Sequence, residues 1–159
     1  MHFRKAQSAV EYLTTYSWAI IIIAITLGAL YALGLFSPSS FISNQCIFPA
    51  DFGCLNDFFY ANGVVFLNIE QATESPINVT AIGCNASGLA SNMTLFQGAN
   101  QIFIPIGSNY TFSASCYANG SVYTSQPGSL YKGYVVVNYT SLQTGFQHVL
   151  IGRIIEKST

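Results

Sequence analysis

The stretch that decides the fold runs from Arg4 to Phe36 and reads RKAQSAVEYLTTYSWAIIIIAITLGALYALGLF. It opens with two basic residues, and from Tyr12 onward the chain carries no charge until Asp51. A helix over 7–36 would be about 45 Å long, whereas a bilayer core is about 30 Å thick. We therefore expect one long hydrophobic helix that spans a membrane and leaves a turn or two over at its N-terminal end. Glu11 lies in that spare length.

The predicted helix ends near Phe36, because Pro38 has no amide hydrogen and biases the residue before it away from helical conformation. Ala24, Gly28 and Ala32 recur every fourth residue within the helix. This spacing places small side chains on one stripe, where a second helix can approach closely. Small residues are common in any membrane helix, so the stripe alone does not establish assembly.

The start of this stretch carries a resemblance to a known family. Lys5 and Ala6, followed by the residues QSAVEYL of 7–13, resemble the class III signal sequence of archaeal type IV pilins. In that family a membrane-embedded prepilin peptidase cuts before the apolar helix. The resemblance implies a cut between Ala6 and Gln7, which makes Glu11 the fifth mature residue, where the family has a glutamate. Bacterial type IV pilins usually carry glycine before the cut and phenylalanine after it. The residues here are Ala6 and Gln7, which favours an archaeal peptidase.

The resemblance covers about the first quarter of the chain and implies a function for the whole. It implies a structural subunit of an extracellular type IV pilus, with an adhesive role, whose N-terminal helices pack into a filament core. The implied partners are copies of the chain, the prepilin peptidase, and an assembly ATPase with its membrane platform. The resemblance implies a leader (1–6) and a hydrophobic helix (7–36). Pro49, Gly53 and two cysteines then favour a loop or linker (37–61), and the strand signals described below favour a β-rich extracellular head (62–159).

Glu11 has two interpretations. Cleavage before Gln7 would create a cationic α-amino group, and related filaments are thought to pair that amine with this glutamate on a neighbouring subunit. Alternatively, Glu11 lies at the cytoplasmic membrane surface and favours the N-terminus of its own helix. The second interpretation suits the unassembled precursor.

Other functions remain open from the sequence. A plain signal anchor has a similar basic start and apolar run, which would make the chain a non-polymerising cell-surface domain. A minor pilin and an archaellum filament protein are further alternatives. By the positive-inside tendency, Arg4 and Lys5 keep the N-terminus cytoplasmic and the rest of the chain is exported. We therefore expect a membrane-held precursor and then a surface filament.

Charge is scarce in this chain. Charged residues make up 7% of it, hydrophobic residues 51%, and the net charge is −1. Such a balance offers no electrostatic footprint for nucleic acid and lacks the charge that usually keeps a small domain soluble. The surface of the head must therefore be covered by neighbouring subunits, by sugars, or by both.

Strand signals dominate the chain after Ala61. Short runs rich in β-branched and aromatic residues alternate with turn residues, and the last two runs, 133–142 and 146–155, flank the turn residues of 143–145. This pattern predicts a closing hairpin within an antiparallel sandwich, Ig-like or barrel-like. With the N-terminal helix, the predicted class is α+β.

The cysteines are Cys46, Cys54, Cys84 and Cys116. Disulfides persist outside the cytoplasm, and four cysteines allow three connectivities. The simplest is Cys46–Cys54 with Cys84–Cys116. A zinc site lacks a C-x-x-C pair, so we expect neither a metal nor a cofactor.

Six segments match the N-x-[ST] glycosylation acceptor. All lie in the expected exported part, at Asn78, Asn85, Asn92, Asn109, Asn119 and Asn138. Sugars there would supply the solubilising layer that the missing charges do not. The alternative is that asparagine and threonine are simply common in polar β-domains. Glycosylation of some of the six, rather than all, is the expectation.

Catalytic motifs are missing from the sequence. It contains no G-x-S-x-G nucleophile motif, phosphate loop, H-E-x-x-H or dinucleotide fingerprint. His148 is the only histidine after the N-terminal His2, and it falls in a strand pattern. We therefore expect a protein that is not an enzyme.

Overall fold

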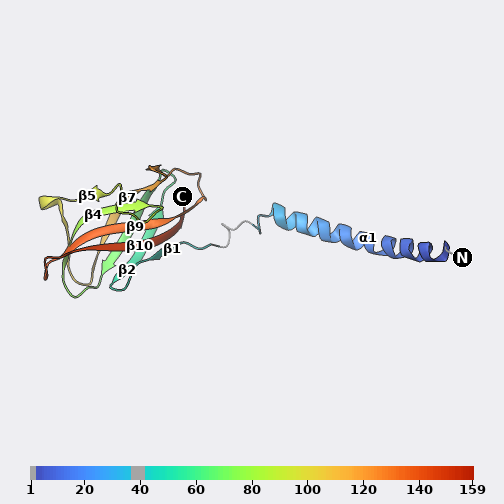
Figure 1. The fold of residues 1–159 in the computed structure, drawn as a ribbon, viewed down its shortest axis with the longest axis horizontal. Helices are drawn as coiled ribbons and strands as arrows, with labels where there is room; N and C mark the ends of the chain where they lie inside the picture. The colour runs from blue at the N-terminus through green and yellow to red at the C-terminus, as the bar shows by residue number, and fades with distance from the viewer. Residues whose placement is uncertain (1–2, 37–41) are drawn as a thin grey trace. The chain divides into compact units, whose positions relative to one another are not determined.

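The computed structural model describes residues 3–36 and 42–159, and the side chains of 3–10, Leu13 and Thr15 are outside that description. The chain divides into two compact units, Met1–Ile42 and Ser43–Thr159. Figure 1 shows a single helix, α1, in the first unit and a twisted sheet in the second.

Helix α1 spans Phe3–Ala32. Its hydroxyl side chains bond to the helix itself, since Ser17 Oγ donates to the Thr14 carbonyl at 3.0 Å and Thr26 Oγ1 donates to the Ile23 carbonyl at 2.9 Å. Such bonds satisfy a polar group within an apolar run without help from another element. The surface of α1 is therefore almost wholly apolar over its second half.

The helix ends at Ala32, and Gly34, two residues later, has a φ of 71°. The amide of Gly34 donates to the Tyr31 carbonyl at 3.0 Å, and the amide of Leu35 donates to the Leu30 carbonyl at 3.3 Å. A glycine in left-handed conformation followed by this backward bond is a common helix C-terminus. The predicted end near Phe36 is therefore wrong, because Gly34 stops the helix before Pro38 acts.

The prediction of a long hydrophobic helix that spans a membrane is also wrong. Across the described residues, none of the helical structure combines the length and apolarity needed to cross a bilayer. The fold is mostly β-sheet, and a long apolar helix does not define its class.

The second unit is one connected sheet of ten strands, whose main path runs β1-β10-β9-β4-β7-β3-β2. The strands are β1 Gln45–Ile47, β2 Phe52–Phe59, β3 Val64–Gln71, β4 Ile77–Asn85, β5 Thr94–Leu95, β6 Ile102–Ile104, β7 Ser108–Ala118, β8 Ser121–Val122, β9 Leu130–Ser141 and β10 Gln147–Lys157. A 3-10 turn occupies Gly98–Asn100. The short β5 and β6 pair with β4, and β8 pairs with β7.

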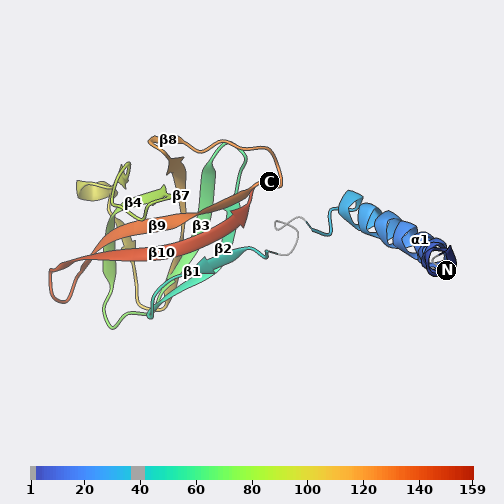
Figure 2. The ribbon, with the colours of Figure 1, turned by 45° about the vertical axis from the view of Figure 1, so that its right-hand side comes forward.

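The last strand of this path, β2, meets the chain just beyond β10, which makes the sheet barrel-like. Phe59 at the end of β2 forms a parallel bridge with Ser158, just beyond β10. The Thr159 amide donates to the Phe59 carbonyl at 2.9 Å, and the Ala61 amide donates to the Thr159 carbonyl at 3.1 Å. Figure 2 shows β1 and β2 beside β10 along this line.

Two features depart from the predicted antiparallel sandwich. β4 and β7 pair in parallel, with Cys84 opposite Cys116, so the sheet is mixed. The segment 37–61, expected to be a loop or linker, contains β1 and β2, while residues 37–41 are outside the described part. The β-rich unit therefore begins at Ser43 rather than at residue 62.

The predicted C-terminal hairpin is confirmed, since β9 and β10 pair antiparallel from Gln147 opposite Thr140 to Lys157 opposite Leu130. Side chains alternate between core and surface along the long strands, as in β3, where Val65, Leu67 and Ile69 are buried. All buried members of the hydrophobic core cluster belong to the second unit. This unit therefore has a core of its own.

Candidate functional site

Two regions of the chain are candidates for function: the apolar surface of α1 and a pocket at one end of the barrel. On α1 the large side chains are exposed, including Ile20 at 66% and Ile25 at 65%. Further exposed members are Tyr12, Tyr16, Trp18, Ile21, Ile22, Ile23, Leu27, Leu30 and Tyr31. Exposed apolar area of this extent marks an interaction surface.

The predicted assembly stripe lies on this surface. Ala24, Gly28 and Ala32 are all exposed on α1, and a β-carbon added at Gly28 would meet no described atom within 4 Å. Glu11 is exposed near the start of the helix. The side chains of the predicted leader-cleavage residues Lys5, Ala6 and Gln7 lie outside the described residues, although the helical backbone of α1 includes these positions.

The predicted disulfides are confirmed as Cys46–Cys54 and Cys84–Cys116. The first links β1 to β2, and the second joins β4 to β7 at their parallel pairing. The sulfurs of Cys46 and Cys54 lie within 4.8 Å of an Asp57 carboxylate oxygen. Because both sulfurs are bonded to each other, neither is the thiolate that a metal would need.

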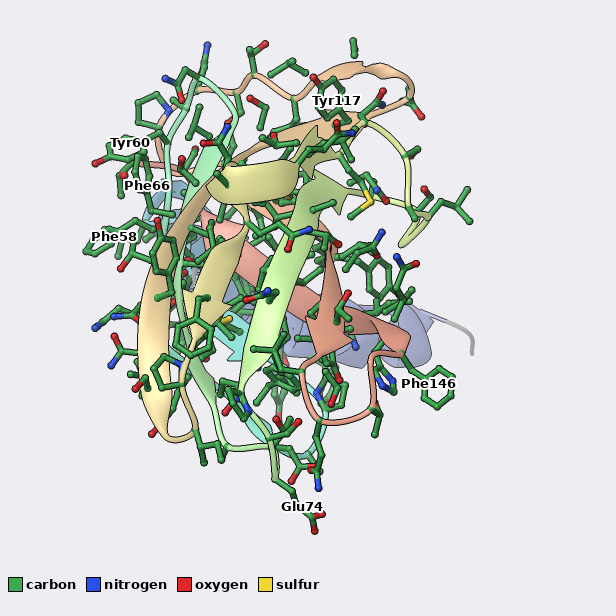
Figure 3. All side chains as sticks on the ribbon, turned by 90° about the vertical axis from the view of Figure 1, so that its left-hand side faces the viewer. Phe58, Tyr60, Phe66, Glu74, Tyr117 and Phe146 are labelled. Carbon is green, nitrogen blue, oxygen red and sulfur yellow. A yellow bond between two sulfur atoms is a disulfide. The ribbon has the colours of Figure 1, made fainter. Side chains whose placement is uncertain are left out.

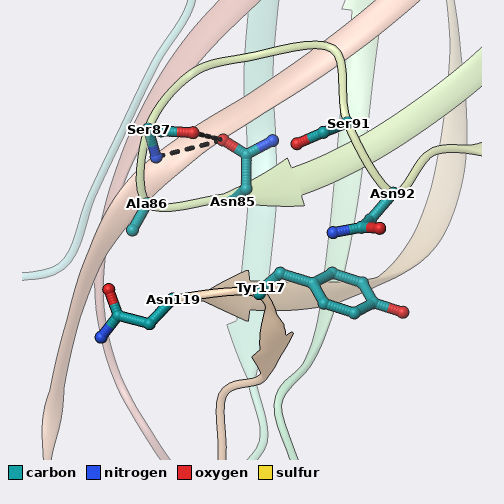
Figure 4. Close-up of a pocket in the computed structure, with 8 residues that line it drawn as sticks. Asn85, Ala86, Ser87, Ser91, Asn92, Tyr117 and Asn119 are labelled. Carbon is teal, nitrogen blue, oxygen red and sulfur yellow. Dashed lines mark hydrogen bonds between the residues drawn. The ribbon is translucent and has the colours of Figure 1, made fainter.

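The pocket lies where β4 and β7 end and has a volume of about 420 Å³. Its lining comes from the end of β4, the loop after it and the turn after β7: Asn85, Ala86, Ser87, Ser91, Asn92, Tyr117, Asn119 and Gly120. Three of these are acceptor asparagines, as Figure 4 shows. The acceptor motif identifies all three asparagines in the sequence. It does not indicate that they line one pocket, because 34 positions separate Asn85 from Asn119.

The Cys84–Cys116 disulfide sets the geometry of this pocket. Asn85 lies opposite Tyr117 in the parallel pairing that follows the disulfide. The loop after β4 then folds back over the strand, and a β-carbon at Gly83 would lie 2.9 Å from Met93 Cγ. Glycine at that position therefore lets Met93 approach closely, which holds the preceding Asn92 at the pocket.

The turn after β7 forms the other wall. Asn119 and Gly120 have φ values of 52° and 82°, as expected of an Asn-Gly hairpin turn. Asn92 also has a positive φ, at 54°. Asparagine tolerates this conformation better than most residues do, so both acceptors suit their positions structurally.

The six acceptor asparagines differ in accessibility. Asn92, Asn109 and Asn119 are exposed, Asn78 and Asn138 are half-buried, and Asn85 is 4% exposed. The Asn78 amide donates to Gln101 Oε1 at 3.4 Å. Asn138 lies on β9 between β4 and β10, and its Oδ1 is buried without a hydrogen-bond partner. All six match the same acceptor motif in the sequence, and only the fold shows that their accessibility differs.

Aromatic side chains form a second exposed surface on the barrel. Phe58, Tyr60 and Phe66 are 59%, 46% and 40% exposed, and the rings of Tyr60 and Phe66 meet edge to face at 5.6 Å. We call these three residues the aromatic patch. Figure 3 shows them together on one side of the barrel.

Ionisable groups in the barrel form no recognisable catalytic arrangement among the described residues. His148 is exposed, and its ring stacks on Tyr139 at 5.2 Å. Burial raises the pKa of Tyr131 to about 12, with a further contribution from Tyr123. Burial raises the pKa of Glu156 to about 9, and the neighbouring Asp57 carboxyl adds to the rise.

No protein-family model matches this chain, and no match was found among the curated proteins compared with it.

Proposed function

We propose that this protein is a structural subunit of an extracellular filament of the archaeal type IV pilus kind, with an adhesive role and no catalytic activity. Helix α1 packs against the α1 helices of neighbouring copies to form the filament core. The β-rich unit forms the outer layer. The resemblance of residues 5–13 to archaeal pilin precursors supports this proposal, together with the surface of α1.

The observation that carries the proposal is the exposure of the α1 side chains. An isoleucine such as Ile20, 66% exposed, contributes about 1.5–3 kcal/mol when it is fully buried. The β-rich unit has its own core, so its folding does not depend on these side chains. Many such residues on one helix favour association with other helices by a large margin.

Copies of α1 are the occupants that best suit this surface. The stripe of Ala24, Gly28 and Ala32 permits close approach of a second helix. A head-to-tail contact between identical chains does not close on itself, and it therefore extends into a fibre. In this proposal, removal of residues 1–6 frees the amine of Gln7 to pair with Glu11 of a neighbouring copy.

The properties of the β-rich unit suit an outer layer. Its two disulfides are typical of proteins outside the cytoplasm, and the end of β2 is bridged to the chain just beyond β10. Neighbouring β-rich units would cover the aromatic patch. The membrane-held precursor, the peptidase and the assembly platform stay predictions from the resemblance.

The test is the composition of filaments sheared from the cells that make this protein. Mass spectrometry should identify this chain in the filament fraction, with an N-terminal peptide that begins at Gln7. Electron microscopy should show the filaments lost when the gene is deleted. A chain from outside the cell that retains Arg4 and Lys5, or that never occurs in polymers, would contradict the proposal.

A further inference from the structure

We propose that Asn92 carries an N-linked glycan whose first sugar lies in the pocket that Asn85 and Tyr117 help to line. In this proposal Asn85, although it matches the acceptor pattern, stays unmodified and serves as part of the sugar site. The inference rests on export of the β-rich unit, which is part of the proposed function, but it does not depend on polymerisation.

Both polar atoms of the Asn85 side chain already form hydrogen bonds within the protein. Its Nδ2, the atom that a glycan would modify, donates to the Leu89 carbonyl. Its Oδ1 accepts hydrogen bonds from the amide and hydroxyl of Ser87, each at 3.1 Å, drawn as dashed lines in Figure 4. Ser87 is the hydroxyl residue of the same acceptor motif. A glycan on Asn85 would break the bond to Leu89 and require the buried side chain to leave its site.

Asn92 meets the opposite conditions. It is exposed, and it lies outside the strands, between the loop after β4 and β5. In Figure 4 its amide lies beside the Tyr117 ring and on the same side as Asn85. A sugar attached at Asn92 therefore starts at the pocket.

The chemistry of the pocket suits a neutral sugar. Amides and hydroxyls from asparagine and serine line it, and no Asp, Glu, Lys, Arg or His is among its lining residues. These groups donate and accept hydrogen bonds as sugar hydroxyls require. Tyr117 contributes an aromatic face for the apolar side of a sugar ring. A volume of about 420 Å³ falls within the range of small-molecule sites.

The modification itself is a transfer of a glycosyl group. Asn92 Nδ2 forms a bond to the anomeric carbon of an oligosaccharide carried on a lipid phosphate, and the bond between that carbon and the phosphate oxygen breaks. The lipid phosphate leaves with the bonding electrons. A base of the transferase takes the proton that the amide loses.

The first test is the occupancy of each acceptor in protein purified from its own cells. Glycopeptide mass spectrometry should find a glycan at Asn92 and none at Asn85. A glycan at Asn85, or an unmodified Asn92, would overturn the proposal. Because this measurement needs only the exported chain, it can succeed or fail independently of any result on filaments.

The second test asks whether the sugar lies in the pocket. Thr94→Ala removes the Asn92 acceptor motif without changing the asparagine, and Tyr117→Leu removes the aromatic face while keeping apolar bulk. If the sugar stacks on Tyr117, Thr94→Ala should lower Tm by about 4 °C in the Tyr117 protein. The same change should lower Tm by less than a third of that amount in the Tyr117→Leu protein.

A matched control separates this effect from general loss of glycan. Thr111→Ala removes the acceptor motif of Asn109, an exposed residue on β7 that is not among the pocket residues. Its effect on Tm should be the same whether residue 117 is tyrosine or leucine. Equal effects of Thr94→Ala in both backgrounds would show that the glycan lies elsewhere and overturn the proposal.

Discussion

Glu156 on β10 is completely buried, and it lies beside the carboxyl group of Asp57 on β2. Both oxygens of Glu156 and one oxygen of Asp57 are buried without a hydrogen-bond partner among the described residues. The two residues precede Phe59 and Ser158, which form a parallel bridge between the end of β2 and the chain just beyond β10. The barrel therefore closes beside two acids, an arrangement that is stable only if at least one carries a proton.

This arrangement predicts that stability falls as the pH rises. Burial raises the pKa of Glu156 from 4.5 to about 9 in the folded chain, with Asp57 adding to the rise. The unfolded chain therefore loses this proton at lower pH than the folded chain does, and stability declines between about pH 4.5 and about pH 9. Urea denaturation at several pH values should show a slope of up to about 1.4 kcal/mol per pH unit.

Glu156→Gln should flatten this dependence, because glutamine has no proton to lose. Glu74→Gln is the matched control, since Glu74 is exposed, and it should leave the slope in place. Stability that stays constant from pH 5 to pH 8 in the unmodified protein would contradict the raised pKa of Glu156 in the folded chain.

The two disulfides should contribute unequally to stability. Cys84–Cys116 closes a segment with a sequence separation of 32, and Cys46–Cys54 one of 8. Chain-entropy estimates give about 3.7 and about 2.5 kcal/mol for loops of these lengths. Replacing Cys84 and Cys116 by serine should therefore lower the free energy of unfolding by about 1 kcal/mol more than replacing the other pair. Equal losses in denaturant titrations would contradict this ranking.

Gly152 on β10 should tolerate no side chain. A β-carbon there would lie 2.3 Å from the ring of Phe48. We expect Gly152→Ala to destabilise the fold by about 1–3 kcal/mol, because overpacking forces the ring or the strand to move. Phe48→Leu should restore part of the loss when it is combined with Gly152→Ala. Thermal unfolding of the three variants measures this, and additive losses would rule out the contact with Phe48.

Gly28 on α1 tests the proposed filament contact. No described atom lies within 4 Å of a β-carbon at this position, and leucine favours helices over glycine by about 1 kcal/mol. Gly28→Leu should therefore leave the folding of the subunit intact but abolish filaments, because it blocks close approach along the stripe with Ala24 and Ala32. Ile25→Leu is the control of similar bulk. Normal filament yield from Gly28→Leu cells would exclude this stripe as the contact.

Much of the β-rich unit follows from local patterns in the sequence. The alternation in 133–142 and 146–155, with turn residues between them, predicts the hairpin that β9 and β10 form. A hairpin depends on neighbouring residues, so local sequence suffices. The disulfide pairing was one of three possibilities and proved to be the simplest. The apolar surface of α1 is likewise visible in composition alone.

Other features depend on partners far away in the chain. Pro49 and Gly53 favoured a loop over 37–61, yet β1 and β2 form there because β10 and β3 supply their hydrogen-bond partners. The predicted end of α1, placed from Pro38, lies beyond the observed one because Gly34 adopts a left-handed conformation first. Local propensity is weaker than the pairing of backbone groups across a sheet.

The sequence by itself determined that the chain has an apolar N-terminal helix surface, a hairpin at its C-terminal end and acceptor asparagines throughout the β-rich part. These depend on residue types and on neighbours within a few positions. Only the tertiary structure decided that Asn85 is buried while Asn92 is exposed, and that Glu156 lies beside Asp57. Burial is a property of what packs around a side chain, and here those neighbours come from strands far apart in the sequence.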